Sequence, residues 1–239
     1  MRKFAAAGIA GLILAMTATA AWAAGSWPGL TVTPTVIPNK AGTKAKPQPV
    51  KLKVAVKWQS LGAANQPIVT QFHVFFPRGS LYNGAKFPTC SVATMNASGP
   101  TGCKPASIMG HGAGVAYADT TLTRPQITVV NGGANTVYFY TVLNNPARVQ
   151  EPIAGHIAKM SGKWAYELSV TVPQNLRIVA GVPIELTSLN VLAGNSAGWL
   201  DTTACDGGHW PFQIMTTYEN PNSGATGSSM YASQVACHS

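Results

Sequence analysis

From Leu30 to the end of the chain, apolar and polar residues alternate in short segments separated by Gly, Pro and Asn. A period of two residues is typical of strands with one buried and one exposed face. In one such segment the apolar residues at 50, 52, 54, 56 and 58 alternate with Lys51, Lys53 and Lys57. Segments 164–172 and 212–218 repeat the pattern. Further candidate strands are 30–37, 68–76, 108–117, 126–131, 136–143, 153–160, 183–192 and 229–236.

This number of short strands predicts an all-β fold. We expect an immunoglobulin-like antiparallel β-sandwich, with a β-barrel or a jelly roll as the alternative. No stretch of ten residues after the N-terminal segment keeps a 3.6-residue apolar period, so parallel α/β folds with crossover helices are disfavoured. Ser188 and Asn190 interrupt the alternation around Leu186 and Leu189, which indicates a β-bulge.

The N-terminal residues 1–23 have the pattern of a secretory signal peptide. Arg2 and Lys3 supply the positive end, an apolar run follows, and Ala21-Trp22-Ala23 is a small-x-small cleavage site. The apolar run is shorter than the roughly 20 residues that span a bilayer, and no second run of spanning length follows. We therefore expect cleavage near Ala23, a mature domain over residues 24–239 without a membrane span, and a secreted, periplasmic or cell-envelope location.

Export changes how the four cysteines are interpreted, because disulfides persist in oxidising compartments. Four cysteines allow three pairings. We predict that neighbours pair, Cys90 with Cys103 and Cys205 with Cys237, because short loops form readily and both segments are rich in turn residues.

Charge is distributed unevenly along the chain. Only 10% of residues are charged, yet the formal net charge is +9, and no acidic residue precedes Asp119. Six lysines gather near a Pro- and Gly-containing loop over residues 38–49 and the strand after it: Lys40, Lys44, Lys46, Lys51, Lys53 and Lys57. A basic surface attracts polyanions, so these lysines are candidate anion-binding residues. Alternatively they keep the protein in solution and block strand-edge pairing.

Candidate chemistry is sparse. Gly194 to Gly198 matches the G-x-S-x-G string of serine hydrolases, with Ser196 as the nucleophile and His209 downstream. No helix pattern follows, so a Gly- and Asn-rich hairpin loop is the favoured interpretation. A zinc site is a further candidate, because the side chains with zinc-ligand chemistry include Cys205, His209, Cys237 and His238. Cys237 and His238 are adjacent, however, and adjacent residues of a strand point to opposite sides, so the spacing does not suit one metal ion. We predict no catalytic residues, metal or cofactor. The glycines at 110, 112 and 114 indicate a close approach of another backbone.

Two blocks of residues resemble recurrent motifs of exported bacterial proteins of unknown function. The first block comprises Pro77-Arg78-Gly79, Asn83, Pro88-Thr89-Cys90-Ser91, Gly99-Pro100, Cys103-Lys104-Pro105, Ser107 and Gly110-His111-Gly112. The closing block comprises Thr202-Thr203-Ala204-Cys205, Trp210-Pro211-Phe212, Tyr218 and Cys237. The resemblance implies a secreted β-sandwich cross-linked by disulfides, and it implies no activity.

For function we expect a non-catalytic envelope or extracellular binding or structural module. Its partner is expected to be an anionic envelope polymer or another exported protein. Nucleic acid is disfavoured, because Trp58 should point away from the lysines rather than interleave with them. Two alternatives remain: a secreted serine hydrolase using Ser196 and His209, and a subunit of an extracellular assembly formed by strand-edge pairing.

Overall fold

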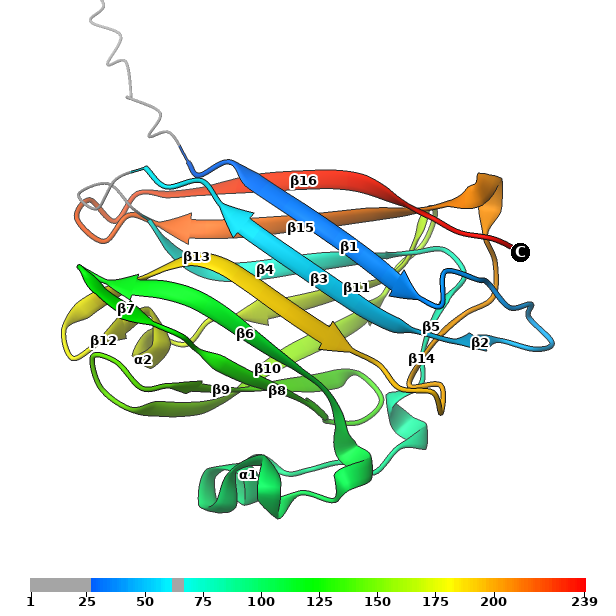
Figure 1. Cartoon of the computed structure of the whole chain (residues 1–239), viewed down its shortest axis with the longest axis horizontal. Coiled ribbons are helices and arrows are strands. Elements are labelled where there is room, and N and C mark those ends of the chain that lie inside the picture. The colour runs from blue at the N-terminus through cyan, green and yellow to red at the C-terminus, as the bar shows by residue number, and fades with distance from the viewer. Residues whose placement is uncertain (1–26, 62–66) are drawn as a thin grey trace, which may run out of the picture.

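The structure, a computed structural model, describes residues 27–61 and 67–239. The predicted signal peptide over residues 1–23 lies outside the described residues. A large antiparallel sheet makes up most of the molecule (Figure 1). Its strands are β1 (Leu30–Ile37), β3 (Lys51–Trp58), β4 (Ile68–Pro77), β6 (Ile108–Ala118), β7 (Thr121–Thr123), β8 (Gln126–Asn131), β9 (Thr136–Leu143), β10 (Val149–Lys159), β11 (Trp164–Thr171), β12 (Ile178–Val179), β13 (Val182–Ala193), β15 (His209–Glu219) and β16 (Thr226–Ala236).

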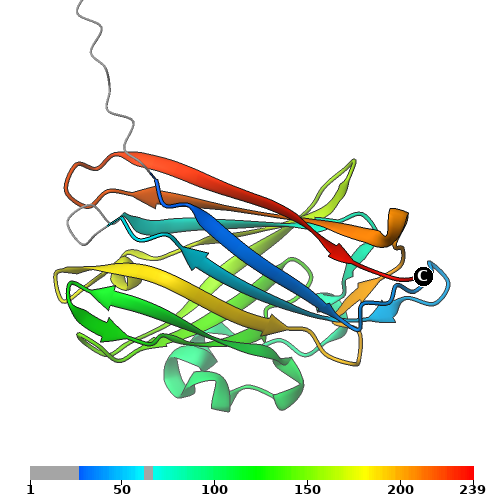
Figure 2. The same cartoon turned by 45° about the horizontal axis from the view of Figure 1, so that its top comes forward.

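The large sheet curls until it is nearly closed like a barrel. Its strand order is β1-β3-β13-β6-β8-β9-β10-β11-β4-β15-β16, with β7 paired to β6 and β12 paired to β13. The two outermost strands, β1 and β16, lie side by side in Figure 1 and Figure 2 and run in the same direction. The all-β prediction is therefore confirmed. The nearly closed sheet matches the β-barrel that we kept as the alternative, rather than the immunoglobulin-like sandwich that we expected.

The seam between β1 and β16 is fastened at its two ends. At one end the Ser229 hydroxyl donates a hydrogen bond of 2.6 Å to the carbonyl oxygen of Pro28. At the other end the backbone N–H of Ala41 donates to the carbonyl oxygen of His238 at 2.7 Å, beside a parallel bridge between Lys40 and His238. Between these ends, no backbone ladder joins β1 to β16 within the described part of the chain.

Short elements cover the two ends of the barrel. A second sheet of β2 (Gln48–Pro49), β14 (Leu200–Thr202) and β5 (Ser80–Tyr82) lies at the end where β3 begins (Figure 1). At the opposite end lies helix α2 (Gln174–Arg177), whose Leu176 packs in a buried cluster with Leu143 and Ile184. The short 3-10 helices are η2 (Gly84–Lys86), η3 (Gly99–Gly102), η4 (Pro105–Ser107) and η5 (Asp206–Gly208).

Helix α1 (Val92–Ser98) packs against the outside of the sheet, over β8 and β9. Its Met95 is fully buried against Val130 and Tyr140. The Ser91 side chain caps the helix by accepting a hydrogen bond of 3.0 Å from the backbone N–H of Thr94. The sequence pattern did not predict α1, because its seven residues are too few to display a helical period.

The alternation of apolar and polar residues determines which side chains face the interior. On β3, Trp58 is 5% exposed on the inner face, whereas Lys51, Lys53 and Lys57 are exposed on the outer face. The predicted bulge is confirmed, because the pairing of β13 with β6 shifts between Leu186 and Ser188.

A second bulge was not predicted. The pairing of β11 with β4 shifts between Trp164 and Tyr166, so the two side chains do not share a face. Trp164 instead packs on Phe75, which points outward from β4, with ring centroids 5.7 Å apart.

Both predicted disulfides are confirmed. Cys90 pairs with Cys103, with Cα atoms 5.5 Å apart, and Cys205 pairs with Cys237, with Cα atoms 5.9 Å apart. Two disulfides are compatible with an oxidising extracellular or periplasmic compartment. No helix within residues 27–61 and 67–239 has both the length and the hydrophobicity that crossing a bilayer requires.

Candidate functional site

The interior of the barrel contains an apolar cavity of about 160 Å³. Inward-facing side chains of ten strands contribute to its wall, Val54, Phe72, Phe139 and Leu168 among them. Thr141 also lines the cavity, and its hydroxyl is already hydrogen-bonded to the carbonyl oxygen of Phe139 at 3.3 Å. No charged side chain lines this cavity. The wall therefore offers van der Waals contact and no unpaired side-chain polar group to a ligand.

The number of strands explains why space remains inside. Side chains just fill a barrel of about eight strands, and a longer circumference leaves room for a ligand. An inward-facing glycine does not add to this room, because neighbouring side chains already fill the space beside it. Gly155 faces inward from β10, and a Cβ there would lie 2.8 Å from the Leu168 Cδ1 atom and 3.0 Å from the Phe139 Cε2 atom, both on residues that line the cavity.

The glycines of β6 have a different role. A Cβ on Gly112 would lie 2.7 Å from the carbonyl oxygen of Asn190, and one on Gly110 would overlap the carbonyl oxygen of Leu192. Both contacts are to the backbone of β13, which pairs with β6. The close backbone approach that the glycines indicated is therefore present.

Two smaller cavities adjoin the main one. They have volumes of about 50 Å³ and about 20 Å³. Phe76 and Leu200 line all three cavities, so these two side chains separate adjacent spaces. The 50 Å³ cavity is also lined by Val36 and Trp210, near the β2-β14-β5 sheet. The apolar space thus extends from the middle of the barrel toward that end.

A network around Asn131 supports the wall of the main cavity at this end. Asn131 is fully buried, and its Nδ2 atom donates to the carbonyl oxygens of Gly84, Phe87 and Pro88 at 2.9, 3.1 and 3.0 Å. Its Oδ1 atom accepts a hydrogen bond of 3.0 Å from Trp199 Nε1. The network therefore ties two loops to the end of β8.

Two aromatic residues of this network also line the cavity. The rings of Tyr82 and Trp199 pack edge to face, with centroids 5.3 Å apart. The Tyr82 hydroxyl lies 2.9 Å from the carbonyl oxygens of both Gly133 and Thr136. Burial raises the pKa of Tyr82 well above its ordinary value, so the phenol stays protonated as a donor. The cavity wall is consequently held by hydrogen bonds that face away from the cavity.

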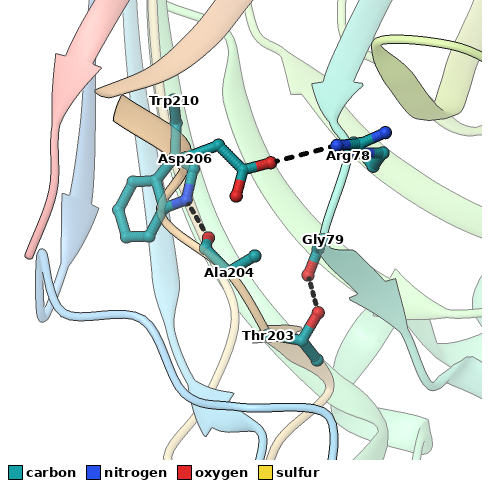
Figure 3. Close-up of polar contacts among 6 residues, drawn as sticks. All are labelled: Arg78, Gly79, Thr203, Ala204, Asp206 and Trp210. Atoms are coloured by element: carbon teal, nitrogen blue, oxygen red, sulfur yellow. Dashed lines mark hydrogen bonds and ion pairs between the residues drawn. The ribbon is translucent and has the colours of Figure 1, made fainter. Parts of the chain in front are cut away.

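The two blocks of residues that the sequence analysis singled out meet beside the small sheet (Figure 3). The backbone N–H and the hydroxyl of Thr203 donate to the carbonyl oxygen of Gly79 at 2.8 and 3.0 Å. Trp210 Nε1 donates to the carbonyl oxygen of Ala204 at 2.7 Å. Arg78 pairs with Asp206 at 3.4 Å, but both side chains are mostly exposed, so this ion pair contributes little. These contacts join the loop after β4 to the segment after β14.

Asp201, on β14, is the buried carboxylate at this end. Only 9% of the residue is exposed, and its Oδ2 atom accepts a hydrogen bond of 2.8 Å from Asn83. Its Oδ1 atom is buried and has no hydrogen-bond partner. Burial raises the pKa of Asp201 above its ordinary value, while the hydrogen bond from Asn83 and the charge of Lys86 oppose the rise.

The six lysines that the sequence singled out for anion binding are all exposed. Lys51, Lys53 and Lys57 share the outer face of β3, and Lys40, Lys44 and Lys46 lie in the loop that leads to β2. No ion pair in the described part of the chain involves any of the six. They are free to meet an anionic partner.

Ser196 and His209 are both exposed, and no hydrogen bond joins them among the described residues. His209 begins β15, and its Nδ1 atom lies 3.2 Å from the carbonyl oxygen of Gly207. Ser196 lies in the turn after β13, where the Asn195 side chain accepts hydrogen bonds from the backbone of Ala197 and Trp199. Within residues 27–61 and 67–239, no three His, Cys, Asp or Glu side chains are grouped to hold a metal ion.

No protein-family model matches the chain, and no curated protein sequence matches it. The candidate site is therefore defined by the structure alone. It is a nearly closed antiparallel barrel with an apolar interior and a basic outer face. Sequence analysis identified the inward-facing residues as core but not the cavity. The one available signal was the number of strands, since unfilled volume depends on how many strands enclose it.

Proposed function

We propose that the protein is a secreted, non-catalytic binding protein that holds an apolar molecule inside its barrel. The observation that carries the proposal is the apolar cavity of about 160 Å³. Apolar cavities of similar size stay dry and take up ligands such as benzene. The ligand class is accordingly a small apolar molecule or the apolar part of a larger one.

Energetics support an occupied cavity. An unfilled cavity costs about 24 cal/mol per Å³, which for this volume is about 4 kcal/mol. Domains of this size are stable by only about 5–15 kcal/mol, so the cost is a large fraction of the total. A ligand that fills the space restores the missing van der Waals contacts.

Binding of a neutral fluorescent probe tests the proposal. N-phenyl-1-naphthylamine should become more fluorescent with the protein, and aliphatic competitors should displace it. Ala193 lines the cavity from β13, so Ala193→Leu should weaken probe binding at least about tenfold while preserving or raising Tm. The matched control is Ala113→Leu, because Ala113 is exposed on neighbouring β6. Equal binding by both variants, or no binding by the wild-type protein, would contradict the proposal.

A second function is favoured by the exposed lysines. We propose that the outer face of β3 binds an anionic partner, as the uneven charge along the sequence led us to expect. Across this face, Lys57 lies between Thr31 of β1 and Ser188 of β13, with no acidic side chain beside it. Five of the seven acidic residues are instead bonded to partners elsewhere: Glu151, Glu167, Asp201, Asp206 and Glu219.

Retention on heparin-agarose tests this second function. Replacing Lys51, Lys53 and Lys57 together by Glu should abolish retention at moderate salt, because the positive charges that attract heparin are lost. Salt weakens whatever attraction other exposed charges supply, because it screens them. A control with three Glu substitutions at Lys86, Lys104 and Lys159, which are also exposed, carries the same net charge. If both triple variants elute at the same salt concentration, only net charge matters, and the β3 face is not the site.

A further inference from the structure

We infer that the anionic partner of the β3 face is a lipid surface, which the protein contacts through a patch of two lysines and two aliphatic side chains. The lysine–aliphatic patch consists of Ile37, Lys51, Lys53 and Leu192. This inference rests on the second proposed function, namely that the lysine face binds an anionic partner. It adds the identity of that partner and the residues that recognise it.

Strand register places the four side chains next to one another. Ile37 on β1 is directly opposite Lys51 on β3, and Leu192 on β13 is directly opposite Lys53. Opposite residues in antiparallel strands have Cβ atoms about 5 Å apart. Lys51 and Lys53 are two residues apart, on one face of their strand, and therefore about 7 Å apart. The patch thus extends over three neighbouring strands on the outside of the barrel.

The aliphatic members are unusually exposed for their type. Ile37 is 49% exposed and Leu192 is 38% exposed. A single exposed aliphatic residue is ordinary on a protein surface. Here two of them stand directly beside two lysines that have no ion pair in the described structure. A hydrophilic polymer would gain nothing from Ile37 and Leu192, whereas an interface of head groups and acyl chains accommodates both kinds of side chain.

No acidic residue stands opposite the patch in the strand register. Beyond Leu192 the next residue across the sheet is His111 of β6, and beside Lys53 on β1 stands Thr35. The acidic residue of β13, Glu185, is seven positions from Leu192, which at about 3.3 Å per residue is about 23 Å. That distance exceeds the Debye length of about 8 Å at physiological ionic strength, so Glu185 does not cancel the attraction of the lysines.

The loop over residues 38–49 continues the basic surface from the end of β1. Ile37 is the last residue of β1, and Lys40, Lys44 and Lys46 follow it in exposed positions. The neighbouring 50 Å³ cavity is lined from the inside by Val36 and Leu52, which belong to the same two strands as Ile37, Lys51 and Lys53. The patch therefore lies over the end of the barrel toward which the apolar space extends.

Vesicle flotation tests the inference. The purified protein is mixed with vesicles of phosphatidylcholine alone, or of phosphatidylcholine with about 30% phosphatidylglycerol, at about 0.1 M salt. We expect association with the anionic vesicles only. Each lysine near an anionic surface contributes about fivefold in affinity, so Lys51→Glu with Lys53→Glu should weaken association about 25-fold or more. Lys104→Glu with Lys159→Glu is the control of equal charge.

The aliphatic side chains separate a lipid surface from a polymer. Ile37→Asn with Leu192→Asn should weaken association with anionic vesicles about tenfold or more. The same variant should elute from heparin-agarose at the wild-type salt concentration. Met230→Asn is the matched control, because Met230 is 63% exposed and lies on β16. Its association with vesicles should equal that of the wild-type protein.

The outcomes distinguish the inference from the function on which it rests. One outcome is that Ile37→Asn with Leu192→Asn associates with anionic vesicles as well as the wild-type protein does, while Lys51→Glu with Lys53→Glu does not. In that case the face binds charge alone and the lipid inference is wrong. Equal association with neutral vesicles, or an equal loss for Met230→Asn, also overturns it. If Lys51→Glu with Lys53→Glu still associates with both vesicles and heparin, the proposed binding of an anionic partner itself fails.

Discussion

Asn131 is the residue on which the most hydrogen bonds of the cavity wall converge. Replacing it by Ala would remove the side-chain partner of the carbonyl groups of Phe87 and Pro88 and of the buried indole N–H of Trp199, whereas the Gly84 carbonyl would keep the backbone N–H of Phe87. A buried polar group without a partner costs about 1–3 kcal/mol. We therefore expect Asn131→Ala to lower the free energy of unfolding by about 3 kcal/mol or more, measured by urea denaturation. Asn135→Ala, at an exposed position four residues away, should change it by less than about 0.5 kcal/mol.

Asp201 makes stability depend on pH in a defined direction. Burial raises its pKa in the folded protein above the ordinary value of 3.8, so the folded state binds the proton more tightly than the unfolded state. The stabilisation that comes from protonated Asp201 is fully present when the pH is below the ordinary pKa, and it is lost as the pH rises through the raised pKa of the folded protein. Asp201→Asn removes this titration and keeps an oxygen to accept from Asn83.

The corresponding measurement compares the two proteins across pH. The unfolding free energy of Asp201→Asn minus that of the wild-type protein should increase from about pH 3 to about pH 7, in urea titrations at matched ionic strength. A difference that is constant with pH, or that decreases, would show that the carboxyl group is not destabilised by burial.

At the residue scale, sequence alternation predicted which side chains face inward along most strands, because a strand turns successive residues to opposite faces. Trp58 and the lysines of β3 follow it. Trp164 does not, because one extra residue at a bulge reverses the face, and nothing local marks that position. Nor could the network of Asn131 be predicted, since its partners lie more than 40 residues away in the sequence.

At the scale of elements, each disulfide joins two cysteines that lie outside the strands. Cys90–Cys103 closes a loop of 13 residues around α1, and Cys205–Cys237 closes one of 32 residues between β14 and the end of β16. By chain entropy, their removal should cost about 3 and about 3.7 kcal/mol. The double Ser variant of each pair, compared in urea denaturation, should show the larger loss for Cys205 and Cys237. The reverse order would mean that packing around α1 outweighs loop entropy.

The long strands were predictable from sequence and the short elements were not. Each long strand carries several alternating residues, whereas β2, β5 and β14 have two or three residues each. These three strands exist because they pair with one another across long stretches of chain. Likewise, α1 depends on packing against Tyr140 and Val130 rather than on its own pattern.

At the scale of the whole molecule, a ligand in the barrel should raise thermal stability. Saturation at about 100 times the dissociation constant adds about 2.7 kcal/mol. For a chain of this length, Tm should rise by about 5 to 10 °C, measured by scanning calorimetry with a displacing aliphatic ligand. Ala193→Leu, whose side chain occupies the same space, should show little further rise. A rise of equal size in that variant would place the ligand elsewhere.

The all-β class, the strand segments and the disulfide pairs followed from the sequence, because each is encoded over a few tens of residues at most. Closure into a barrel and the volume inside it were not encoded locally. They depend on pairings such as β13 with β3 and β4 with β15, which join distant parts of the chain. The candidate cavity could therefore be seen only after the strands were assembled.

The seam between β1 and β16 has a mechanical consequence. In a tube whose every neighbouring strand is bonded, the circumference is fixed by strand number and stagger. Here the two facing edges are fastened near Pro28 and near Ala41, with no ladder between these points in the described chain. Local separation of the two edges between these points breaks no ladder bond, so we expect the girth of the tube to be adjustable there.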